Sequence, residues 1–357
     1  MSRPRIAVIG AGMSGLAAAI TLQTAGADVT VIEKSRGLGG RVASRRVGDI
    51  VVDHGAQNIK PGDSLLHEVM TTRLSSKDLV RIEKPVCLWS PPGTIHTPDE
   101  EYNSALKYSY YGGINTIARL LAFELQQLGG TVSLNATARH FTENEQGVEL
   151  FDVNNSTLGE FRGVVVSAPL PQAADFVANS APFTAHPINV LDRVRSLRQI
   201  EYRSCITVML GYYRIPATPD LYALLAADRS ADLLWLAFES CKGSGHSKGT
   251  HEVLVAQMGA RFSKYCYLEE DAITASRVIA EVESLLGSEF RSPDWYQVKR
   301  WRYSQPVGMV YFDDANPAGS EGALLVCGDG LRPNGGKIHE AYLSGIEAGN
   351  RAKLLWL

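Results

Sequence analysis

Near its N-terminus the chain has two short apolar runs separated by a glycine-rich turn and a helix-like segment. Residues 6–9 and 29–32 are the apolar runs, residues 10–15 hold three glycines, and residues 16–25 are rich in alanine and leucine. This order predicts a strand, a tight turn, a helix and a second strand. Because a helix between two strands is the usual crossover of a parallel sheet, the unit constrains the fold more than any other feature of the chain.

The glycines follow the pattern G-x-G-x-x-G, which is typical of a dinucleotide site. The first allows the tight turn, the second lets backbone approach a diphosphate, and the third lets the helix pack on the strand. The helix start then offers free N–H groups to the phosphates. The residues expected to make these contacts are Gly10, Ala11, Gly12, Met13, Ser14 and Gly15.

An acidic residue closes the second apolar run. Glu33 can accept hydrogen bonds from both hydroxyls of an adenosine ribose, and its charge would repel a 2′-phosphate, which disfavours NADP at this site. Lys34 follows, and a glycine-rich loop then leads to Gly40 and Arg41. An arginine here can offset diphosphate charge. Simple NAD dehydrogenases do not need this second contact with the diphosphate, so the segment favours FAD.

The far end of the chain supplies a second glycine–acid turn. Residues 324–330 read as a strand that runs into Gly328 and Asp329, and the acid could bond a ribityl hydroxyl. Lys337 and Ile338 begin a helix whose N-terminus could face the flavin end of the cofactor. FAD is long enough to need binding elements at both places.

The order of predicted strands and helices changes along the chain. Strand and helix patterns alternate at both ends and around residues 130–170, whereas residues 171–300 hold long alternating strands and one helix over 271–286. Residues 132–134 and 147–153 read as strands joined by a polar turn. We therefore expect an α/β protein: a Rossmann-type FAD-binding domain assembled from discontinuous segments, with an inserted substrate domain on a mixed β-sheet. The expected FAD-binding segments are 1–60, 112–170 and 300–357, and the expected substrate segments are 61–111 and 171–299.

Composition excludes several classes of protein. The 357 residues carry a net charge of −3, with no basic excess for nucleic acid. No apolar run reaches 18 residues, and the N-terminus lacks the pattern of a signal peptide, so we expect a cytoplasmic protein that is not in a membrane. The five cysteines contain no C-x-x-C pair, which argues against a disulfide framework.

Several segments resemble the flavin amine oxidase superfamily, and within it the renalases. Residues 8–41 resemble its FAD signature, and residues 53–57 (DHGAQ) resemble its D-x-G-A-Q motif. Residues 299–305 (KRWRYSQ) resemble the W-R-x-S-Q segment of renalases. Further similar segments are 111–114, 164–169 and 328–330 with Ile338.

The resemblance implies positions for individual residues. Ser14 and Arg41 would lie at the phosphates, Gln57 and Asn58 near the flavin, and Ala138 would offer backbone to the adenine. FAD would be bound non-covalently. Renalases often have an aromatic residue where Asn58 stands, which leaves the shape of the substrate face open.

The resemblance also implies a reaction, the oxidation of 2- and 6-dihydro isomers of NAD(P)H. Hydride would pass to flavin N5, and O2 would take the electrons and give hydrogen peroxide. No proton must leave carbon, so no catalytic side chain is expected. The candidate substrate contacts are Asn58, Trp301, Arg302 and Tyr303, and aromatic packing between domains explains the two aromatic residues about equally well. No metal site is expected, although His246 and His251 lie close in sequence.

Two other interpretations stay open. The chain could oxidise amines or amino acids on the same fold, where a lysine usually lies near N5; Lys299 is a candidate for that lysine. It could also bind FAD without turnover. The expected partners are a small-molecule substrate and O2.

Overall fold

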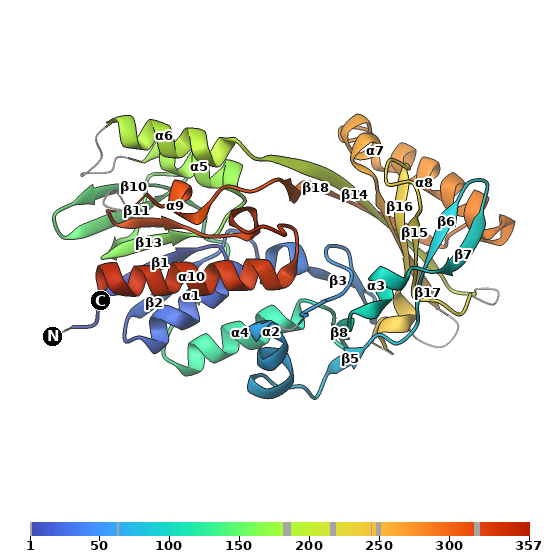
Figure 1. Ribbon diagram of the computed structural model, residues 1–357, viewed down its shortest axis with the longest axis horizontal. Coiled ribbons are helices and arrows are strands. Elements are labelled where there is room, and N and C mark those ends of the chain that lie inside the picture. Colours follow the sequence, from blue (N-terminus) through green and yellow to red (C-terminus); the bar gives the residue numbers. More distant parts are fainter. Residues whose placement is uncertain are drawn as a thin grey trace.

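The computed structural model has two lobes joined by long strands (Figure 1). It describes residues 2–62, 64–180, 187–214, 219–243, 245–247, 251–317 and 322–357. One lobe holds a five-stranded parallel sheet and both ends of the chain, and the other holds a seven-stranded sheet. Strands β14 (Glu201–Tyr212) and β18 (Trp295–Val307) pair along their length and run between the lobes.

The parallel sheet has the order β19–β13–β1–β2–β9. Its central strands are buried on both faces, which explains their continuous apolar sequences. The strands are β1 (Arg5–Ile9), β2 (Asp28–Ile32), β9 (Thr131–Ser133), β13 (Gly163–Val166) and β19 (Leu324–Val326).

Three helices share one apolar core with this sheet. They are α1 (Met13–Thr24), α4 (Thr116–Gln127) and α10 (Ile338–Trp356). A short helical segment, α2 (Leu65–Glu68) and η2 (Val69–Arg73), joins the same core. Helix α10 packs closely on α1 because Gly345 has no side chain: a Cβ there would lie 2.0 Å from the Ser14 carbonyl oxygen. This close packing brings the start of α10 to the dinucleotide end of the lobe.

The other face of the sheet is covered by a small antiparallel sheet and three helices. These elements are β10 (Ala138–Asn144), β11 (Gly147–Asp152), β12 (Thr157–Phe161), α5 (Leu170–Asn179), α6 (Pro187–Arg198) and α9 (Phe312–Ala315). Two sequence expectations were wrong here. Residues 132–134 and 147–153 are not joined by a turn, since β10 lies between them and pairs with β11. Residues 171–300 hold more than one helix.

The second lobe is built on a sheet of order β18–β14–β17–β16–β15–β6–β7. Only β15 and β6 pair in parallel, so the sheet is mixed. Its other strands are β6 (Val86–Ser90), β7 (Thr94–Pro98), β15 (Ala223–Ala226), β16 (Leu233–Phe238) and β17 (Glu252–Met258). Helices α7 (Ala260–Tyr265) and α8 (Asp271–Leu286) cover one face, and α8 matches the prediction.

The opposite face of this sheet packs against a hairpin from the first lobe, β3 (Ser44–Val47) and β4 (Ile50–Asp53). Ile50 and Val52 contact Met209 and Val253 in a small core of their own. The turn after Asp53 is thereby fixed between the lobes.

The remaining elements are η1 (Gly40–Val42), β5 (Leu79–Arg81), α3 (Glu100–Ser104), β8 (Tyr108–Tyr110), η3 (Glu239–Lys242), η4 (Ser288–Phe290) and η5 (Asp329–Leu331).

The expected fold class is confirmed: a Rossmann-type sheet assembled from discontinuous segments, with a second lobe on a mixed sheet. The exact domain division stays a prediction, and its boundary at residues 299/300 falls within β18. All five cysteines are free. Among the described helices, none is both long and apolar enough to cross a membrane.

Candidate cofactor and substrate site

The glycine turn after β1 has the geometry that its sequence predicts. Gly10 has a φ of 102°, and a Cβ on Gly15 would lie 2.0 Å from the Gly10 carbonyl oxygen. The first and third glycines are therefore required by the packing of the turn on α1. Gly12 differs, because no atom lies within 4 Å of the position where its Cβ would be.

Open space lies in front of the first turn of α1. The helix has no side-chain cap and no acidic residue in that turn, so no side chain competes with an anion for its positive dipole end. Met13 and Ser14 are buried, and they offer backbone here. The loop that follows β2 closes over the turn: the Gly39 amide donates to the Ala11 carbonyl at 2.9 Å, and Gly40, with a φ of 55°, lies beside Gly12.

Glu33 is buried, and its carboxylate accepts hydrogen bonds from the Ala11 and Ser35 amides, at 2.8 and 2.7 Å. Each carboxylate oxygen has a further lone pair, so ribose hydroxyls can still donate to it. Lys34 points to solvent. Ala138 opens β10, where it pairs with Asp152, and the preceding Ala136 amide donates to the Glu33 carbonyl.

Arg41 and Asp329 form one bidentate ion pair, although the sequence assigned them to different parts of FAD. The guanidinium contacts the two carboxylate oxygens at 2.8 and 2.6 Å and also donates to the Ser304 carbonyl at 3.1 Å. Asp329 is 3% exposed and accepts a further bond from the Gly336 amide. The pair therefore connects the loop after β2 with the turn before α10.

The turn before α10 also leaves room for a ligand. Gly328 has no atom within 4 Å of a Cβ position, and its amide donates to the Ser344 hydroxyl. Lys337 is exposed and precedes the helix without capping it, and Ile338 begins the helix against the core.

These features together fit FAD. Two glycines, Gly12 and Gly328, open onto space that a Cβ would occupy, and two helix starts, those of α1 and α10, lack side-chain caps. The buried acid Glu33 lies at the end where the adenosine ribose is expected. When bound, FAD supplies the electron-accepting chemistry that protein side chains lack.

The turn after β4 lies directly against the Arg41 backbone. The Ala56 amide donates to the Arg41 carbonyl at 2.9 Å, and a Cβ on Gly55 would lie 2.2 Å from that oxygen. His54 stacks on Trp301, which donates from its indole nitrogen to the His54 carbonyl at 2.9 Å. Burial, helped by Arg45, lowers the pKa of His54 to about 4, so the imidazole is neutral at pH 7.

Gln57 and Asn58 are held by contacts within the protein. The Gln57 amide donates to the Asp53 carbonyl at 2.5 Å and to the Gly55 carbonyl at 3.2 Å. Asn58 donates toward the hydroxyls of Tyr102 and Tyr222, at 3.1 and 3.4 Å. The predicted roles of both residues stay predictions.

The candidate substrate residues of β18 differ in exposure. Trp301 and Tyr303 are half-buried, and Tyr303 makes an edge contact with Tyr202. Arg302 is exposed, with its guanidinium over the Tyr303 ring. Lys299 places its ammonium 4.8 Å from the centre of the Trp301 ring, a cation–π contact.

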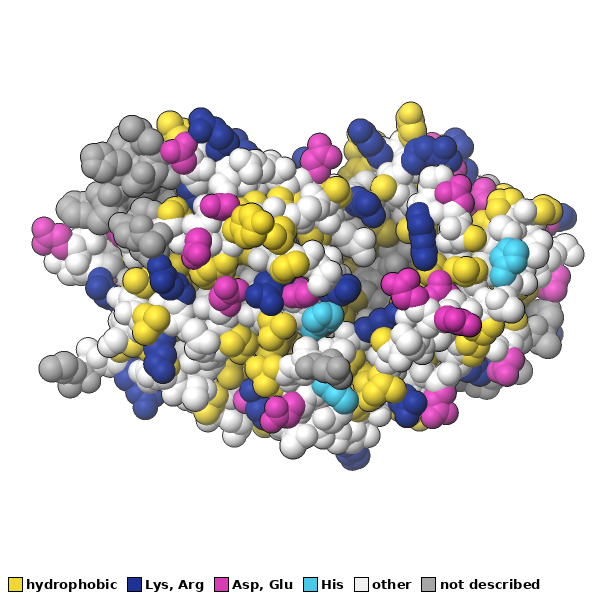
Figure 2. Space-filling view, in the orientation of Figure 1, with side chains coloured by type: hydrophobic (Ala, Val, Ile, Leu, Met, Phe, Trp, Pro, Cys, Tyr) yellow, Lys and Arg dark blue, Asp and Glu magenta, His cyan; other side chains and the backbone are white. Residues whose placement is uncertain are grey.

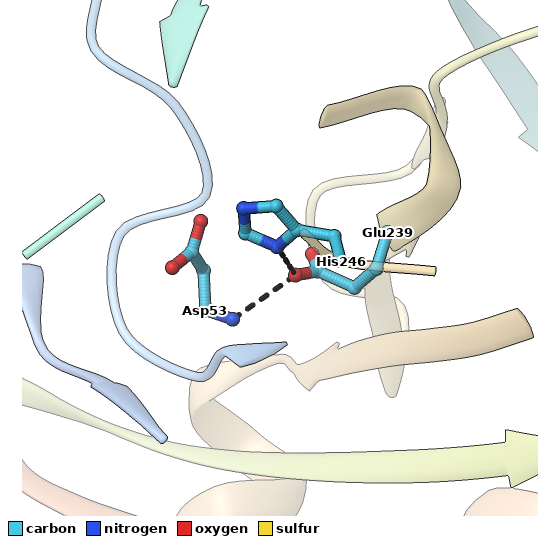
Figure 3. A group of neighbouring side chains, drawn as sticks. All are labelled: Asp53, Glu239 and His246. Carbon is cyan, nitrogen blue, oxygen red and sulfur yellow. Dashed lines mark hydrogen bonds and ion pairs between the residues drawn. The ribbon is translucent and has the colours of Figure 1, made fainter. Parts of the chain in front are cut away.

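Sequence reasoning missed a buried polar group between the lobes (Figure 3). It consists of Asp53, Glu239 and His246, which Figure 3 shows, together with Lys242, and all four side chains are fully buried. Glu239 and Lys242 stand three residues apart in η3, and no motif marks them. They are found only when the fold brings η3 to the end of β4.

Three of these residues, Asp53, Glu239 and His246, have the donor types of a metal site. However, the Lys242 ammonium already contacts both carboxylates, and the second nitrogen of His246 bonds the Tyr110 carbonyl at 3.0 Å. A side-chain cation therefore stands where a metal would bind. His251 does not join the group, since its ring lies against Tyr213.

Comparisons with known proteins place the chain in a family. Residues 8–72 match the NAD(P)-binding Rossmann-like domain, and residues 93–352 match the flavin containing amine oxidoreductases. A solved putrescine oxidase, a triple mutant with redesigned cofactor binding, has the same fold, with a TM-score of 0.75 over 99% of both chains and 15% identity.

Two curated relatives are similar to this chain over a short segment. Protoporphyrinogen oxidase 2 of Arabidopsis thaliana is 42% identical over 59 residues, which are 16% of this chain and 12% of that protein. L-amino-acid oxidase of Sistrurus catenatus edwardsii is 41% identical over 64 residues, or 18% of this chain and 12% of that protein. The matched segments thus span about an eighth of these relatives. The family match covers most of the sequence, and the chain belongs to the flavin-containing amine oxidoreductases, a family of oxidoreductases whose cofactor is FAD.

Proposed function

We propose that this protein is an FAD-dependent oxidase of the renalase type, which takes hydride from 2- and 6-dihydro isomers of NAD(P)H and passes the electrons to O2 to give H2O2. Its substrate is thus a dinucleotide that carries a diphosphate. The fold alone does not select this substrate, because the family also includes amine and amino-acid oxidases.

The observation that carries the proposal is a group of lysines next to Asn58. Burial and the nearby charge of Lys107 lower the pKa of Lys60 to about 8, and Lys337 at the start of α10 adds to the effect. The Lys60 carbonyl bonds His339 of α10 at 3.0 Å, so this group borders the flavin end. Asp99 and Glu101 offset part of the charge. Three lysines near two acids leave an excess of positive charge, which would favour an anionic ligand and disfavour a cationic amine.

The proposal places this ligand between the lobes. Figure 2 shows the molecule hollowed between the two lobes, with charged side chains of both signs around the hollow. The lysines would bind the substrate diphosphate, and the Asn58 amide would orient the nicotinamide carboxamide. His54 is neutral at pH 7 and Gln57 is an amide, so neither competes for a proton. This suits a reaction in which hydride leaves and no proton must be taken from carbon.

One observation favours the alternative, an amine or amino-acid oxidase. The Lys60 ammonium lies 2.8 Å from the centre of the Tyr102 ring, which shows that this ring can hold an ammonium group. Tyr222 lies beside Asn58 as well, and a pair of aromatic rings suits an amine. In that case Lys60 would have to move aside for the substrate.

The lysine group can be tested by Lys60→Gln and Lys337→Gln. We expect KM for 6-dihydro-NAD to rise about tenfold in each variant, with kcat nearly unchanged, because the lysines contact a part of the substrate that does not react. The corresponding dihydronicotinamide riboside, which has no phosphate, should show no change. Lys84→Gln, at an exposed ion pair with Asp220, is the control. Equal changes for both substrates would contradict the assignment.

A further inference from the structure

The buried group between the lobes is balanced in charge. Lys242 contacts Glu239 and, at 3.3 Å, Asp53. His246 bonds Glu239 through Nδ1 at 2.9 Å and the Tyr110 carbonyl through Nε2 at 3.0 Å. Both partners are acceptors, so the imidazole must donate from both nitrogens and carries a positive charge. Two cations thus face two carboxylates in a volume that water does not reach.

Further hydrogen bonds hold Asp53 in this group, and Glu239 Oε1 is paired with the Lys242 ammonium. The Asp53 carboxylate accepts from the Ile114 amide at 2.9 Å and from the Ser44 hydroxyl at 2.6 Å. The Asp53 amide donates to Glu239 at 3.0 Å. Buried charges are tolerated only when they are paired and hydrogen-bonded in this way, so the geometry of the group is strongly determined.

Lys242 extends this group to the turn that lies against the cofactor loop. Its ammonium is 3.3 Å from the Gln57 side-chain oxygen, and the nitrogen of the same amide bonds the Asp53 and Gly55 carbonyls. Lys242 therefore fixes which way the Gln57 amide points. The turn itself has no freedom to shift alone, because Gly55 and Ala56 are packed on the Arg41 carbonyl.

We propose that Lys242 is a positioning residue for the flavin: it holds the 53–57 turn, and through this turn Arg41 and Trp301, in the place where they border the cofactor. The role does not depend on the substrate, so it stands whether the protein oxidises dihydronicotinamides or amines. Lys242 acts through other residues and does not touch the reacting atoms.

The proposal has an electrostatic consequence. Removing the ammonium leaves two buried carboxylates and one imidazolium, a net negative charge near the flavin end. Negative charge disfavours the reduced flavin, which gathers negative charge itself, so the reduction potential should fall. A change of position alone would instead alter FAD affinity and the visible spectrum.

The test uses the full-length protein loaded with FAD. Lys242→Met removes the ammonium, and Glu239→Gln/Lys242→Met removes one charge of each sign, so that the group stays neutral. Lys242→Arg is the conservative variant, and Lys84→Met on the surface is the control. For each variant we would measure the Kd for FAD, the visible spectrum of the bound flavin and its reduction potential against a dye.

We expect the Kd for FAD to rise about tenfold in both Met variants, with a changed visible spectrum. The reduction potential should fall in Lys242→Met and fall less in the double variant. Lys242→Arg should keep values close to those of the wild type, and Lys84→Met should not differ from the wild type. A folded double variant with wild-type affinity, spectrum and potential would overturn the proposal. So would failure of both Met variants to fold, because Lys242 would then serve the fold rather than the placement of the turn.

Discussion

The two ends of the cofactor site are built by different means. At the diphosphate end, the backbone of residues 10–15 and a glycine loop close to it in sequence form the surface. At the proposed flavin end, Lys242 bonds Gln57 in the 53–57 turn, and the Arg41–Asp329 ion pair joins the loop after β2 to the turn before α10, so side chains far apart in sequence hold these segments in place. The first end depends on the absence of side chains, whereas the second depends on buried charges and their partners.

This difference predicts different responses to change. A surface made of backbone is insensitive to pH but does not tolerate a Cβ where two segments touch. A surface fixed by buried ion pairs tolerates small changes of shape but depends on protonation and on each partner. The following substitutions separate the two ends, in order of decreasing expected effect.

Gly15→Ala should have the largest effect, because its Cβ would lie 2.0 Å from the Gly10 carbonyl oxygen. Overpacking of this kind costs roughly 1–3 kcal/mol or more, so we expect FAD affinity to fall about 100-fold. Gly37→Ala is the matched control, since no atom lies within 4 Å of its Cβ position. Titration of the apoprotein with FAD measures both. Equal affinities would show that the turn is less rigid than described.

Arg41→Ala should weaken FAD binding about 10- to 150-fold, since a charge-assisted contact contributes roughly 1.5–3 kcal/mol. The change also leaves Asp329 buried without its partner. Asp329→Asn in the Arg41→Ala background should recover part of the loss, as a double-mutant cycle would show. Full FAD content after dilution and gel filtration would remove Arg41 from the site.

Glu33→Ala should lower affinity for FAD by about tenfold or more, and affinity for FMN much less, because FMN has no adenosine ribose. Titration of the apoprotein with FAD and with FMN measures both affinities. An equal loss for FAD and FMN would mean that the effect comes from the Ala11 and Ser35 amides, which also bond this carboxylate.

The buried group around Lys242 should show the smallest effect, which depends on pH through His246. Burial alone would lower its pKa, but Glu239 and Asp53 together raise it above the ordinary value of 6.5, against the opposing charge of Lys242. The stabilisation is therefore complete below about pH 6.5 and is lost as pH rises through the folded-state pKa. Each tenfold gain in the proton affinity of the folded protein contributes about 1.4 kcal/mol.

Thermal unfolding followed across this pH range checks the effect. Stability of the wild-type protein should decline toward alkaline pH, and His246→Gln should be less stable at neutral pH and lose most of this slope. The same slope in the variant would mean that another group titrates. Removal of the surface ion pair between Arg261 and Asp232 is the control, since exposed pairs contribute little to stability.

The difference between the two ends of the site also explains which parts the sequence could predict. The glycine turn, β1, α1, β2 and Glu33 are contiguous, so spacing and period alone indicated them. The resemblance supplied the Trp301 segment and the 53–57 turn. The Arg41–Asp329 pair and the group around Lys242 could not be predicted, because each joins residues that only the folded chain brings together. The strand β10 was missed because its polar sequence, ARHFTEN, shows no clear alternation.

Helices α5 and α6 were missed for another reason. Helix α6, over residues 187–198, contains four charged residues, so its apolar period is weak. The strong strand pattern of the residues that follow led to a prediction of mainly strands for the whole segment. Tertiary packing against the outer face of the parallel sheet, rather than local propensity, stabilises these helices.

The measurement that tests the proposed function most directly is anaerobic reduction of the FAD-loaded protein. It would be mixed in turn with 6-dihydro-NAD, with ordinary NADH, and with putrescine and a panel of amino acids, while the visible flavin absorbance is followed. Hydride transfer needs the reacting atoms about 3–3.5 Å apart, so a rigid pocket that accepts the 6-isomer holds the 4-isomer out of reach. We predict fast bleaching with 6-dihydro-NAD, slow or no bleaching with NADH, none with amines or amino acids, and peroxide when air is admitted. Rapid bleaching by an amine or an amino acid, with none by the dihydro isomer, would contradict the account.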